Sequence, residues 1–574
     1  MAKSRKTPVL IVGGGPVGLA LAVELGYHGI SCVLVEQGNG VIGTPKMNEV
    51  NIRTMEFCRR WGIADRVLNC PFPADYPMDV AFVTSLSGYE LGRLPRPPRN
   101  SQKPDPWSPM RLQACSQIWF DPILRDFASS FPTVTLRYGC RLDAFEQSSQ
   151  GVMATISELA SGHSETIEAD YLVGCDGGSS TVRRALGIEL IGEGTIGHPI
   201  NLFFRKPGLL DLCGRKPATF FLGIDNNGVW GNIRVIDPVN GVWRIMVDDT
   251  DGSATPETID REFYLRRAIG LPLDVEWIDV NVWRRRSALA ECYGKGRVFL
   301  AGDAVHQLSP TGGLGMNTGV ADAVDIGWKL AAAIAGWGGP KLLDSYDLER
   351  RPAGGRNVRM ATNFHAGVEA FSKGGGDINE DSAESARLRR EIGEKLVRDV
   401  GREFRTVGLQ IGYHYDKSPI CVADGTPAPA DTPESYLPSA RPGARAPHFW
   451  LRDGRSVLDL YGHGFALLRF PGAPPAPSIE QAAQLRHVPL TSMELDEPEA
   501  TSLYGRRMAL VRPDGHVAWR GDTPPIDPIA LIDQVRGAKS RFNLTPGCAF
   551  RSFAYVAIRQ AVANGCSPAT APAA

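Results

Sequence analysis

The chain has 574 residues, enough for two or three domains with a large core. Its formal net charge of −1 gives no electrostatic basis for binding nucleic acid or an anionic membrane surface. No window approaches the roughly eighteen apolar residues of a membrane span, and the basic N-terminus lacks an apolar signal segment, so we expect a cytoplasmic protein.

The cysteines indicate a reducing environment and no metal centre. All 11 are scattered singly, with no CxxC pair and no Cys/His cluster at zinc spacing. We therefore expect buried thiols and no metal site.

The first predicted unit is a nucleotide-binding turn. An apolar run at residues 9–12 enters Gly13-x-Gly15-x-x-Gly18, a helix-like apolar run follows, and a second β-branched run ends at Glu36. This is the pattern of a βαβ dinucleotide fingerprint. The glycines allow a tight turn, backbone approach to a pyrophosphate and close helix packing. The helix N-terminus favours the phosphate, and Glu36 can accept a hydrogen bond from a ribose hydroxyl.

Residues 169–187 predict another strand, turn and helix, and the turn carries Asp176-Gly177-x-x-Ser180-x-Val182-Arg183. Arg183 has two interpretations, since it can anchor this segment or bind a phosphate.

A second glycine triplet is not interpreted as a nucleotide site. Gly192-x-Gly194-x-x-Gly197 has the same spacing, but Pro199 and a strand-like run follow it. Proline blocks the helix start that the fingerprint needs, so we predict a loop between strands.

Residues 200–250 change to the alternation of an antiparallel sheet, in the runs NLFFR, ATFFLGI, VWGNIRVI and VWRIMV. Inserted into an α/β domain, such a sheet would form a separate wall or lid. Residues 297–310 again predict a strand and a loop, and residues 315–335 a helix with an Ala-rich face. The loop carries a third motif, GDAVH at 302–306, which continues to PTGGLGMN at 310–317.

The C-terminal part predicts an exposed loop at 372–384, a charged helical stretch to about 409, and a Pro-, Ala- and Gly-rich segment at 418–446. Beyond it, Pro513-Asp514-Gly515 between two strand-like runs indicates a hairpin. The last residues, CSPATAPAA, predict a frayed tail.

The three motifs, in their order and spacing, resemble those of the group A flavoprotein aromatic hydroxylases, the family of p-hydroxybenzoate hydroxylase and phenol hydroxylase. The resemblance covers residues 7 to about 355 and continues more weakly to the C-terminus, where RPGARAPHFWL at 441–451 opens a thioredoxin-like domain in the phenol hydroxylase branch. It implies an α/β fold with a Rossmann-like FAD-binding domain (GR2 type), an inserted antiparallel-sheet substrate domain and a C-terminal thioredoxin-like α/β domain lacking CxxC. The expected bounds are 1–415, with sheet segments at about 80–110 and 190–290, then a linker at 416–440 and the last domain at 441–574.

The resemblance also implies a cofactor site. Asp303 is expected on the ribityl chain of tightly bound FAD, Asp176 on the FAD and pyridine nucleotide side, and Gln117 at the flavin. N–H groups at the start of the helix after the third motif could support negative charge on reduced flavin. The expected FAD contacts are Gly13, Gly15, Pro16, Val17, Gly18, Glu36, Gln37, Lys46, Gln117, Asp176, Gly302, Asp303, Pro310, Gly313, Gly315, Met316 and Asn317.

Two positions depart from the family. Lys46 replaces a flavin-contacting arginine, keeping the charge but losing the planar fork. Asn48 aligns with an aspartate near the substrate of phenol hydroxylase, and an amide cannot act as a base.

The resemblance implies a monooxygenase that uses NADH or NADPH, O2 and a flavin C4a-hydroperoxide to hydroxylate a phenolic or otherwise activated aromatic ring. The substrate is expected between the flavin and the sheet, where period two places Trp230, Asn232 and Arg234 on one face, with Arg244 on the next strand. An ordinary solvated sheet face is the alternative. The candidate catalytic residues are Asn48, Arg234, Pro310 and His306, although a histidine like His306 is more often structural.

Other functions remain open. A Baeyer–Villiger or epoxidising enzyme acting on a polyketide-like substrate shares these motifs. A flavin halogenase is disfavoured because no WxWxIP segment is present, and a non-enzymatic module of the prenyl-escort type shares only the first motif. We expect a small aromatic substrate, a possible homodimer, and a role in aromatic compound catabolism.

Overall fold

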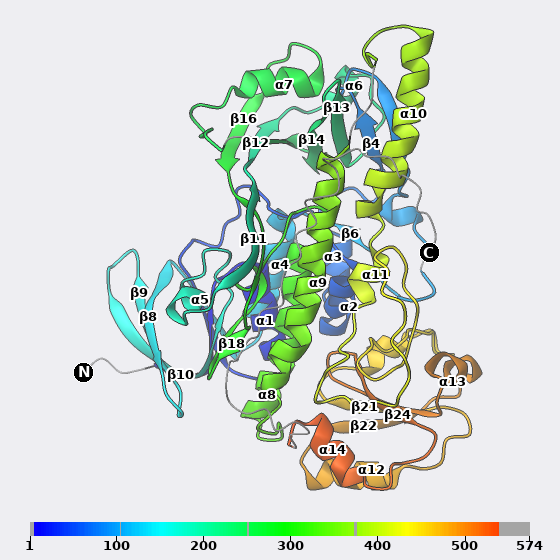
Figure 1. The fold of residues 1–574 in the computed structure, drawn as a ribbon. Coiled ribbons are helices and arrows are strands. Elements are labelled where there is room, and N and C mark those ends of the chain that lie inside the picture. Colours follow the sequence, from blue (N-terminus) through cyan, green and yellow to red (C-terminus); the bar gives the residue numbers. More distant parts are fainter. Residues whose placement is uncertain (1–4, 104, 250–251, 372–375, 539–574) are drawn as a thin grey trace, which may run out of the picture. The chain divides into compact units, whose positions relative to one another are not determined.

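The structure is a computed structural model that describes residues 5–103, 105–249, 252–371 and 376–538. Its first layer is a sheet in the order β18-β19-β10-β1-β2-β7 (Figure 1). Strands β19, β10, β1, β2 and β7 run parallel. Because this sheet is covered on its faces, β2 and the second part of β1, from Pro8 to Val12, are almost continuously apolar. The strands are β1 Arg5–Val12, β2 Cys32–Glu36, β7 Val134–Tyr138, β10 Ser164–Gly174, β18 Gly294–Lys295 and β19 Val298–Leu300.

The helix predicted after the first glycine turn is α1 (Pro16–Tyr27), which packs against α4 (Gln117–Ser129) and α8 (Gly315–Ile334). It is apolar on every side because it is covered on every side. A meander of β8 (Cys140–Gln147) and β9 (Val152–Glu158) joins β10 at the edge of the first layer. The βαβ unit predicted from the sequence is therefore confirmed.

The second sheet has seven strands in the order β16-β12-β15-β14-β13-β4-β5. Its pairs are antiparallel except β13 with β4, which come from separate parts of the chain. In Figure 1 it lies beyond the carboxyl ends of the parallel strands, beneath α7 (Arg261–Ile269). The strands are β4 Val80–Val83, β5 Glu90–Leu94, β12 Pro199–Arg205, β13 Phe220–Asp225, β14 Gly228–Asp237, β15 Val242–Asp248 and β16 Glu276–Val282.

The second glycine triplet forms a strand, and the predicted loop there is wrong. Residues Leu190–Gly197 are β11, which pairs antiparallel with β17 (Arg285–Ala290) through two register shifts. A Cβ on Gly192 would lie 2.3 Å from the carbonyl oxygen of Ser287. The glycines therefore serve a bulged pairing in which two backbones approach closely.

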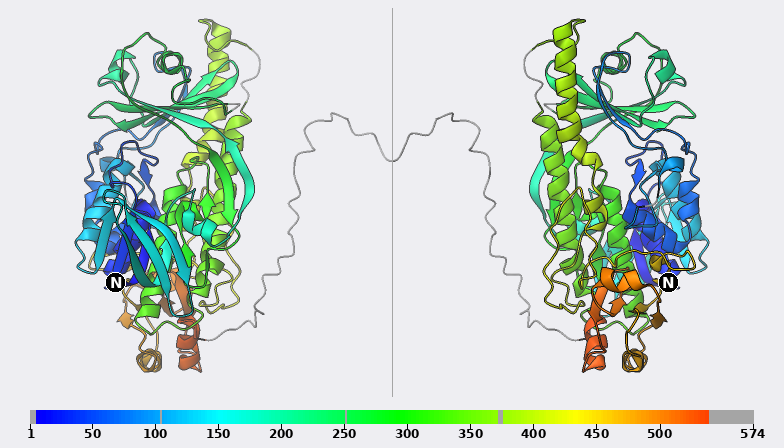
Figure 2. Two further views of the ribbon diagram at one scale, coloured as in Figure 1. Left: turned by 90° about the vertical axis from the view of Figure 1, so that its left-hand side faces the viewer. Right: turned by 90° about the vertical axis from the view of Figure 1, so that its right-hand side faces the viewer.

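Helix α9 (Asp344–Glu369) touches β14 of the second sheet (Figures 1 and 2). It also touches β17 and β20 (His306–Gln307), which form a separate three-stranded sheet with β11. Helix α10 (Ala383–Asp399) then packs against β5, and η3 (Val400–Phe404) and α11 (Val407–Ile411) return toward α2 (Ile52–Trp61). The charged stretch was thus correctly predicted as helical. Residues 372–375 of the predicted loop lie outside the described residues.

The C-terminal unit has the sheet order β22-β21-β23-β24, with β21 parallel to β22 and antiparallel to β23. Its β-α-β-α-β-β-α sequence is that of a thioredoxin-like fold, and β23 and β24 form the predicted hairpin around Pro513-Asp514-Gly515. The elements are β21 Phe465–Arg469, α12 Pro477–Leu485, β22 Leu490–Glu494, α13 Pro498–Tyr504, β23 Met508–Val511, β24 Val517–Gly521 and α14 Pro528–Val535. The tail predicted at the C-terminus lies outside the described residues.

Candidate active site

The first glycine turn leaves a cradle at the N-terminus of α1. Gly13 has φ +108°, and a Cβ there would lie 2.4 Å from the carbonyl oxygen of Cys175. Gly18 packs so closely that a Cβ would lie 2.0 Å from the oxygen of Gly13. Around Gly15, by contrast, no atom of the described chain lies within 4 Å of an added Cβ. Two glycines are thus explained by packing within the protein, while the third faces open space.

Glu36 is held at the end of β2 by the same turn. Its carboxylate accepts hydrogen bonds from the N–H groups of Gly14 (2.7 Å) and Gly38 (2.6 Å). Gln37 beside it is exposed. A carboxylate fixed next to the glycine cradle suits a ribose hydroxyl, as the sequence predicted.

Asp176 lies directly across from this turn, at the carboxyl end of β10. One oxygen accepts the N–H groups of Thr181 (2.7 Å) and Val182 (3.1 Å), whereas Oδ1 is buried without a partner among the described residues. Arg183 donates to the carbonyl oxygens of Gly178 and Ala304, at 3.3 and 3.0 Å. Arg183 therefore anchors the second motif to the third.

The third motif packs against α1 beside the cradle. Gly302–Ala304 form the short helix η2, where Gly302 packs against Val17 of α1 and Asp303 is exposed. In the loop after the exposed Pro310, an added Cβ on Gly313 would meet no described atom within 4 Å. No described side chain caps the N-terminus of α8, so its N–H groups and dipole can face a ligand.

Asn317 has a different task from the one its position suggests. Its Oδ1 accepts from the N–H of Asn51 (2.9 Å) and the hydroxyl of Thr54 (2.8 Å), and its Nδ2 donates to the oxygen of Gly313 (2.9 Å). The side chain therefore links α2 and the loop at residues 310–314 to α8. Because these bonds occupy the Asn317 side chain, the FAD contact predicted for Asn317 would come from its backbone. The FAD contact predicted for Met316 stays a prediction.

Lys46 and Gln117, which were both predicted to contact FAD, are joined by a hydrogen bond. Oε1 of Gln117 accepts the backbone N–H of Lys46 at 2.9 Å, and its Nε2 donates to Asp121 at 3.0 Å. The amine of Lys46 is exposed. Burial raises the pKa of Asp121 to about 7, against the lowering effects of Gln117 and Lys46.

The raised pKa of Asp121 predicts a pH-dependent stability. Below pH 4 both folded and unfolded states hold the proton, so Asp121 contributes nothing. Between pH 4 and 7 only the unfolded state releases it, so stability falls as pH rises, by up to about 4 kcal/mol for a shift of about three units. Asp121→Asn should remove this loss and raise the unfolding midpoint in urea at pH 8 but not at pH 4. An equal effect at both pH values would contradict it.

His306 is buried and is not among the residues that line the chamber between the two sheets. It is 0% exposed, and its Nε2 lies 2.7 Å from Oδ2 of Asp322, which Arg350 contacts at 2.8 Å through Oδ1. Burial opposes ionisation of Asp322, but Arg350 and His306 outweigh it and lower its pKa. The geometry assigns His306 a structural role, and its candidacy as a general base is corrected accordingly.

His306→Gln should therefore lower the melting temperature while leaving catalysis intact. Losing a charge-assisted hydrogen bond costs about 1.5–3 kcal/mol. Turnover per bound flavin should stay within about threefold and the pH–rate profile should not move. A loss of about a hundredfold or more, as for a missing general base, would restore the catalytic interpretation.

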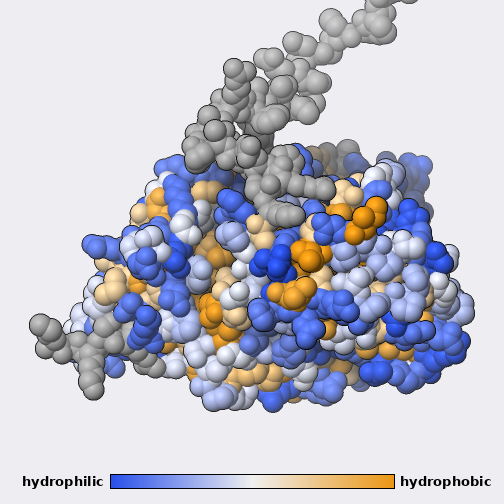
Figure 3. Space-filling view, turned by 90° about the horizontal axis from the view of Figure 1, so that it is seen from below, coloured by the Kyte–Doolittle hydropathy of each residue, from blue (hydrophilic) through white to orange (hydrophobic). Residues whose placement is uncertain are grey.

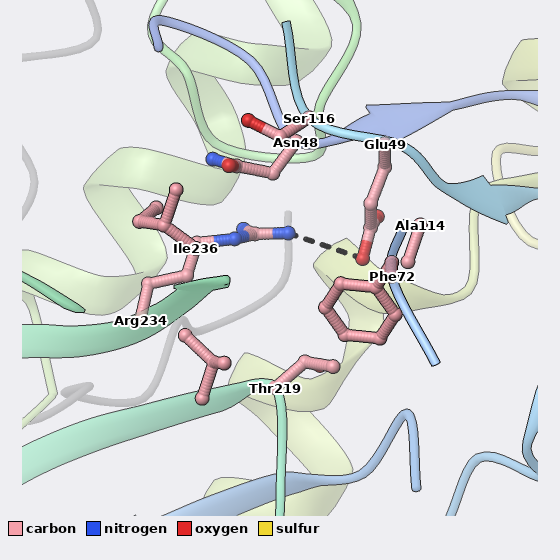
Figure 4. A pocket seen from close by; sticks show the side chains of 9 residues that line it. Asn48, Glu49, Phe72, Ala114, Ser116, Thr219, Arg234 and Ile236 are labelled. Carbon is pink, nitrogen blue, oxygen red and sulfur yellow. Dashed lines mark ion pairs between the residues drawn. The ribbon is translucent and has the colours of Figure 1, made fainter. Parts of the chain in front are cut away.

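A chamber lies between the first sheet's loops and the second sheet. The space between its lining residues is about 230 Å³ with the adjoining open solvent included. In Figure 4 the guanidinium of Arg234 points between Asn48 and Glu49, with the ring of Phe72 beside it. Arg234 Nη2 lies 3.2 Å from the Glu49 carboxylate. The lining residues are Asn48, Glu49, Phe72, Ala114, Ser116, Thr219, Arg234, Val235 and Ile236.

Three polar atoms of the residues that line this chamber have no hydrogen-bond partner. They are Oδ1 of Asn48, Oγ of Ser116 and Nε of Arg234, all buried within the described chain. A buried polar group without a partner is costly, so each indicates a ligand.

Asn232 and Arg234, two of the residues predicted to share one sheet face, lie on the chamber side of the sheet together with Arg244. Arg244 donates to Asn232 Oδ1 at 2.9 Å. Trp230 does not line the chamber. A register shift opposite Gly223 breaks the two-residue alternation there, and Trp230 instead lies under Arg267 of α7, 5.0 Å from the ring centre. The prediction for Trp230 is therefore corrected by a bulge that the sequence pattern does not reveal.

Several site residues were missed from the sequence. Glu49 follows Asn48 directly, and its position in β3 (Glu49–Val50) could have suggested it. Phe72, Thr219 and Glu403 carry no motif, because only folding brings their segments together.

The arrangement fits an extended dinucleotide with a flat ring. The open space at Gly15, the unpaired oxygen of Asp176 and the uncapped N-terminus of α8 each offer a place for a group of the ligand. These residues would hold the adenosine, the pyrophosphate and the ring of FAD. The fold and site thus define a flavoprotein with a separate substrate chamber.

Comparison with known proteins agrees. Residues 6–361 match the FAD binding domain family, and residues 439–538 match the aromatic-ring hydroxylase C-terminal family. This chain belongs to the group A flavoprotein hydroxylases and is an FAD-dependent monooxygenase.

Three relatives illustrate the similarity. The FAD-dependent monooxygenase apdD of Emericella nidulans is 35% identical, over 90% of this chain and 87% of that protein. A putative polyketide hydroxylase of Streptomyces halstedii is 33% identical, over 90% and 94%. The solved structure of native and K252c-bound RebC-10x superposes with a TM-score of 0.88 at 38% identity, over 93% of this chain and all of that chain. Among the described residues, no helix is long and apolar enough to cross a membrane.

Proposed function

We propose that this enzyme hydroxylates an aromatic ring that already bears a hydroxyl or amino group. The ring would lie in the chamber against Phe72, with its polar substituent on Asn48. The observation that carries the proposal is the set of buried polar atoms without a partner on Asn48, Ser116 and Arg234, which line that chamber.

The overall reaction balances as NAD(P)H, a proton, O2 and the arene giving NAD(P)⁺, water and the hydroxylated arene. FAD supplies electron transfer and O2 activation when bound. The protein's part is to orient the ring and exclude water. Asn48 can hydrogen-bond a substrate hydroxyl as donor or acceptor but cannot remove its proton. Arg234, with its positive charge, favours a substrate oxygen that carries negative charge.

Glu49 is a poor candidate for a base. Burial opposes its ionisation, but Arg96 and Arg234 outweigh burial and lower its pKa. A carboxylate held ionised by two guanidinium groups takes up a proton weakly. It serves better to fix Arg234 in place.

The test is a screen of phenols, naphthols and anilines for stimulated NADH or NADPH oxidation by the yellow holoenzyme, with products identified by mass and NMR. We expect at least one compound to stimulate oxidation and gain one oxygen on its ring. Oxygen inserted beside a ketone would indicate Baeyer–Villiger chemistry instead. Failure of every aromatic compound to stimulate oxidation would contradict the proposal.

A homodimer and a cytoplasmic location are further proposals. The face seen from below mixes scattered apolar groups with polar ones (Figure 3). This face by itself therefore singles out no partner surface, and sedimentation of the holoenzyme is the direct test.

A further inference from the structure

Arg244 is a buried cation that faces another cation. It is 8% exposed, and the register of β14 and β15 pairs it directly with Arg234. Directly opposed residues of antiparallel strands lie on the same face, and like charges there repel. Such a pair in the interior destabilises the sheet unless something compensates it.

The nearby carboxylates already pair with other arginines. Glu49 serves both Arg234 and Arg96, each at 3.2 Å. Asp248 lies 2.9 Å from Arg285.

Arg244 itself contacts only a neutral partner in the described chain, Oδ1 of Asn232, and its Nε is buried without any. Burial first, then Arg234 and Arg285, lower the pKa of Arg244 to about 9.

A further carboxyl, which is buried, does not compensate it either. Glu403, on η3, lies near the backbone of Gly312 and near Arg234, and burial raises its pKa to about 7. No ion pair joins Glu403 to Arg244 within the described residues. The chamber side of the sheet therefore carries an excess of guanidinium charge next to the place where the ring would lie.

We propose that Arg244, supported by Arg234, receives the carboxylate of an aromatic acid substrate. This rests on the proposed function and names its substrate class. The planar fork of arginine matches a carboxylate through two parallel hydrogen bonds. A bound carboxylate would compensate the opposed guanidinium groups and satisfy nitrogen atoms that the protein leaves unpaired.

The binding test uses matched ligands on the holoenzyme. 3-Hydroxy-2-naphthoate, its methyl ester and 2-naphthol share one ring system, as do 3-hydroxybenzoate, its methyl ester and phenol. Titration followed by the flavin absorbance gives each Kd. We expect each acid to bind at least about tenfold tighter than its ester and its decarboxylated analogue, as charged hydrogen bonds allow. A phenolate site would instead favour the phenols, with tighter binding at higher pH.

Arg244→Gln should abolish that preference, weakening the acids about tenfold or more while leaving the esters within about twofold. Arg205→Gln is the matched control, because Arg205 lies on β12 of the same sheet but is 40% exposed and pairs with Glu276. Equal binding of acid and ester by the unaltered enzyme would overturn the inference while leaving the hydroxylase proposal standing. If no aromatic compound of either kind perturbs the flavin, the proposed function itself fails.

A ligand-free measurement decides the same point independently. If Arg244 serves a ligand, Arg244→Met should leave the melting temperature of the holoenzyme unchanged or raise it, because it removes an uncompensated charge. Arg285→Met should lower it, since Arg285 bonds both Asp248 and His365 at 2.9 Å. A fall for Arg244→Met as large as that for Arg285→Met would show a structural role and overturn the proposal.

Discussion

Gly15→Val is expected to give a folded but colourless protein. The residue has φ −74° and ψ −178°, a conformation open to any amino acid, and an added Cβ meets no described atom within 4 Å. The side chain would occupy the space where the pyrophosphate must approach the N-terminus of α1. We expect flavin content, measured as absorbance near 450 nm relative to 280 nm, to fall at least about tenfold. Far-UV circular dichroism should not change.

Gly18→Ala is the matched comparison in the same turn. Its Cβ would lie 2.0 Å from a backbone oxygen, so this smaller change should damage the fold itself and lower solubility and melting temperature. We therefore expect opposite outcomes for the two variants. Gly15→Val, with the larger side chain, should fold but not bind FAD, whereas Gly18→Ala should fold poorly. Normal flavin content in Gly15→Val would refute the placement of FAD.

Arg512→Met is expected to destabilise the whole enzyme by about 3–5 kcal/mol. Arg512 belongs to the C-terminal hairpin and is 0% exposed. It donates to Glu349 of α9 at 2.6 Å and to Asp514 at 2.7 Å, and lies 3.3 Å from Asp325 of α8. Without it, Lys329 would remain as the ion-pair partner of Asp325 and Glu349, and the buried Asp514 would lose its guanidinium partner.

The pKa shifts explain how this cluster holds together. Burial alone would raise the pKa of Glu349, but Arg512 and Lys329 outweigh it and lower it to about 2. Burial raises the pKa of Asp325 to about 8, so this carboxyl is the one that keeps a proton near neutral pH. Because Asp325 lies on α8, whose N-terminus meets the flavin site, the C-terminal unit braces the cofactor helix.

The melting temperature of the holoenzyme measures the loss of stability in Arg512→Met. Flavin retention after dialysis measures how far the C-terminal unit supports the cofactor helix α8. Arg452→Met is the control, because Arg452 and its partner Asp496 have side chains 65% and 74% exposed. That exposed pair should contribute no more than about 1 kcal/mol. Equal melting temperatures for the two variants would refute the role assigned to the buried cluster.

Local pattern was enough for much of the fold. The glycine turn with its strand and helix, the hairpin at Pro513-Asp514-Gly515, and the helix after the third motif all depend on residues within one segment. The glycine triplet at 192–197 shows the limit of such reasoning. Its spacing matches the nucleotide fingerprint and the proline that follows argued against a nucleotide site, but only the pairing with β17 shows that it is a bulged strand.

The candidate site divides in the same way. The motifs located the FAD cradle because each glycine or aspartate acts through its own turn. They did not separate Trp230 from Arg234, since a single register shift moves one to α7 and leaves the other in the chamber. Nor did they show that Asn317 and Gln117 use their side chains to hold backbone of other segments.

The sequence by itself determined that this protein carries a dinucleotide turn, three flavin-hydroxylase motifs and a thioredoxin-like last unit without a dithiol, because each is encoded by residues adjacent along the chain. Only the tertiary structure decided which charges are compensated. Within the described residues, Arg512 pairs with Glu349 and Asp514, Arg350 with Asp322, and Arg244 with no carboxylate, and each outcome depends on strands and helices that meet only after folding.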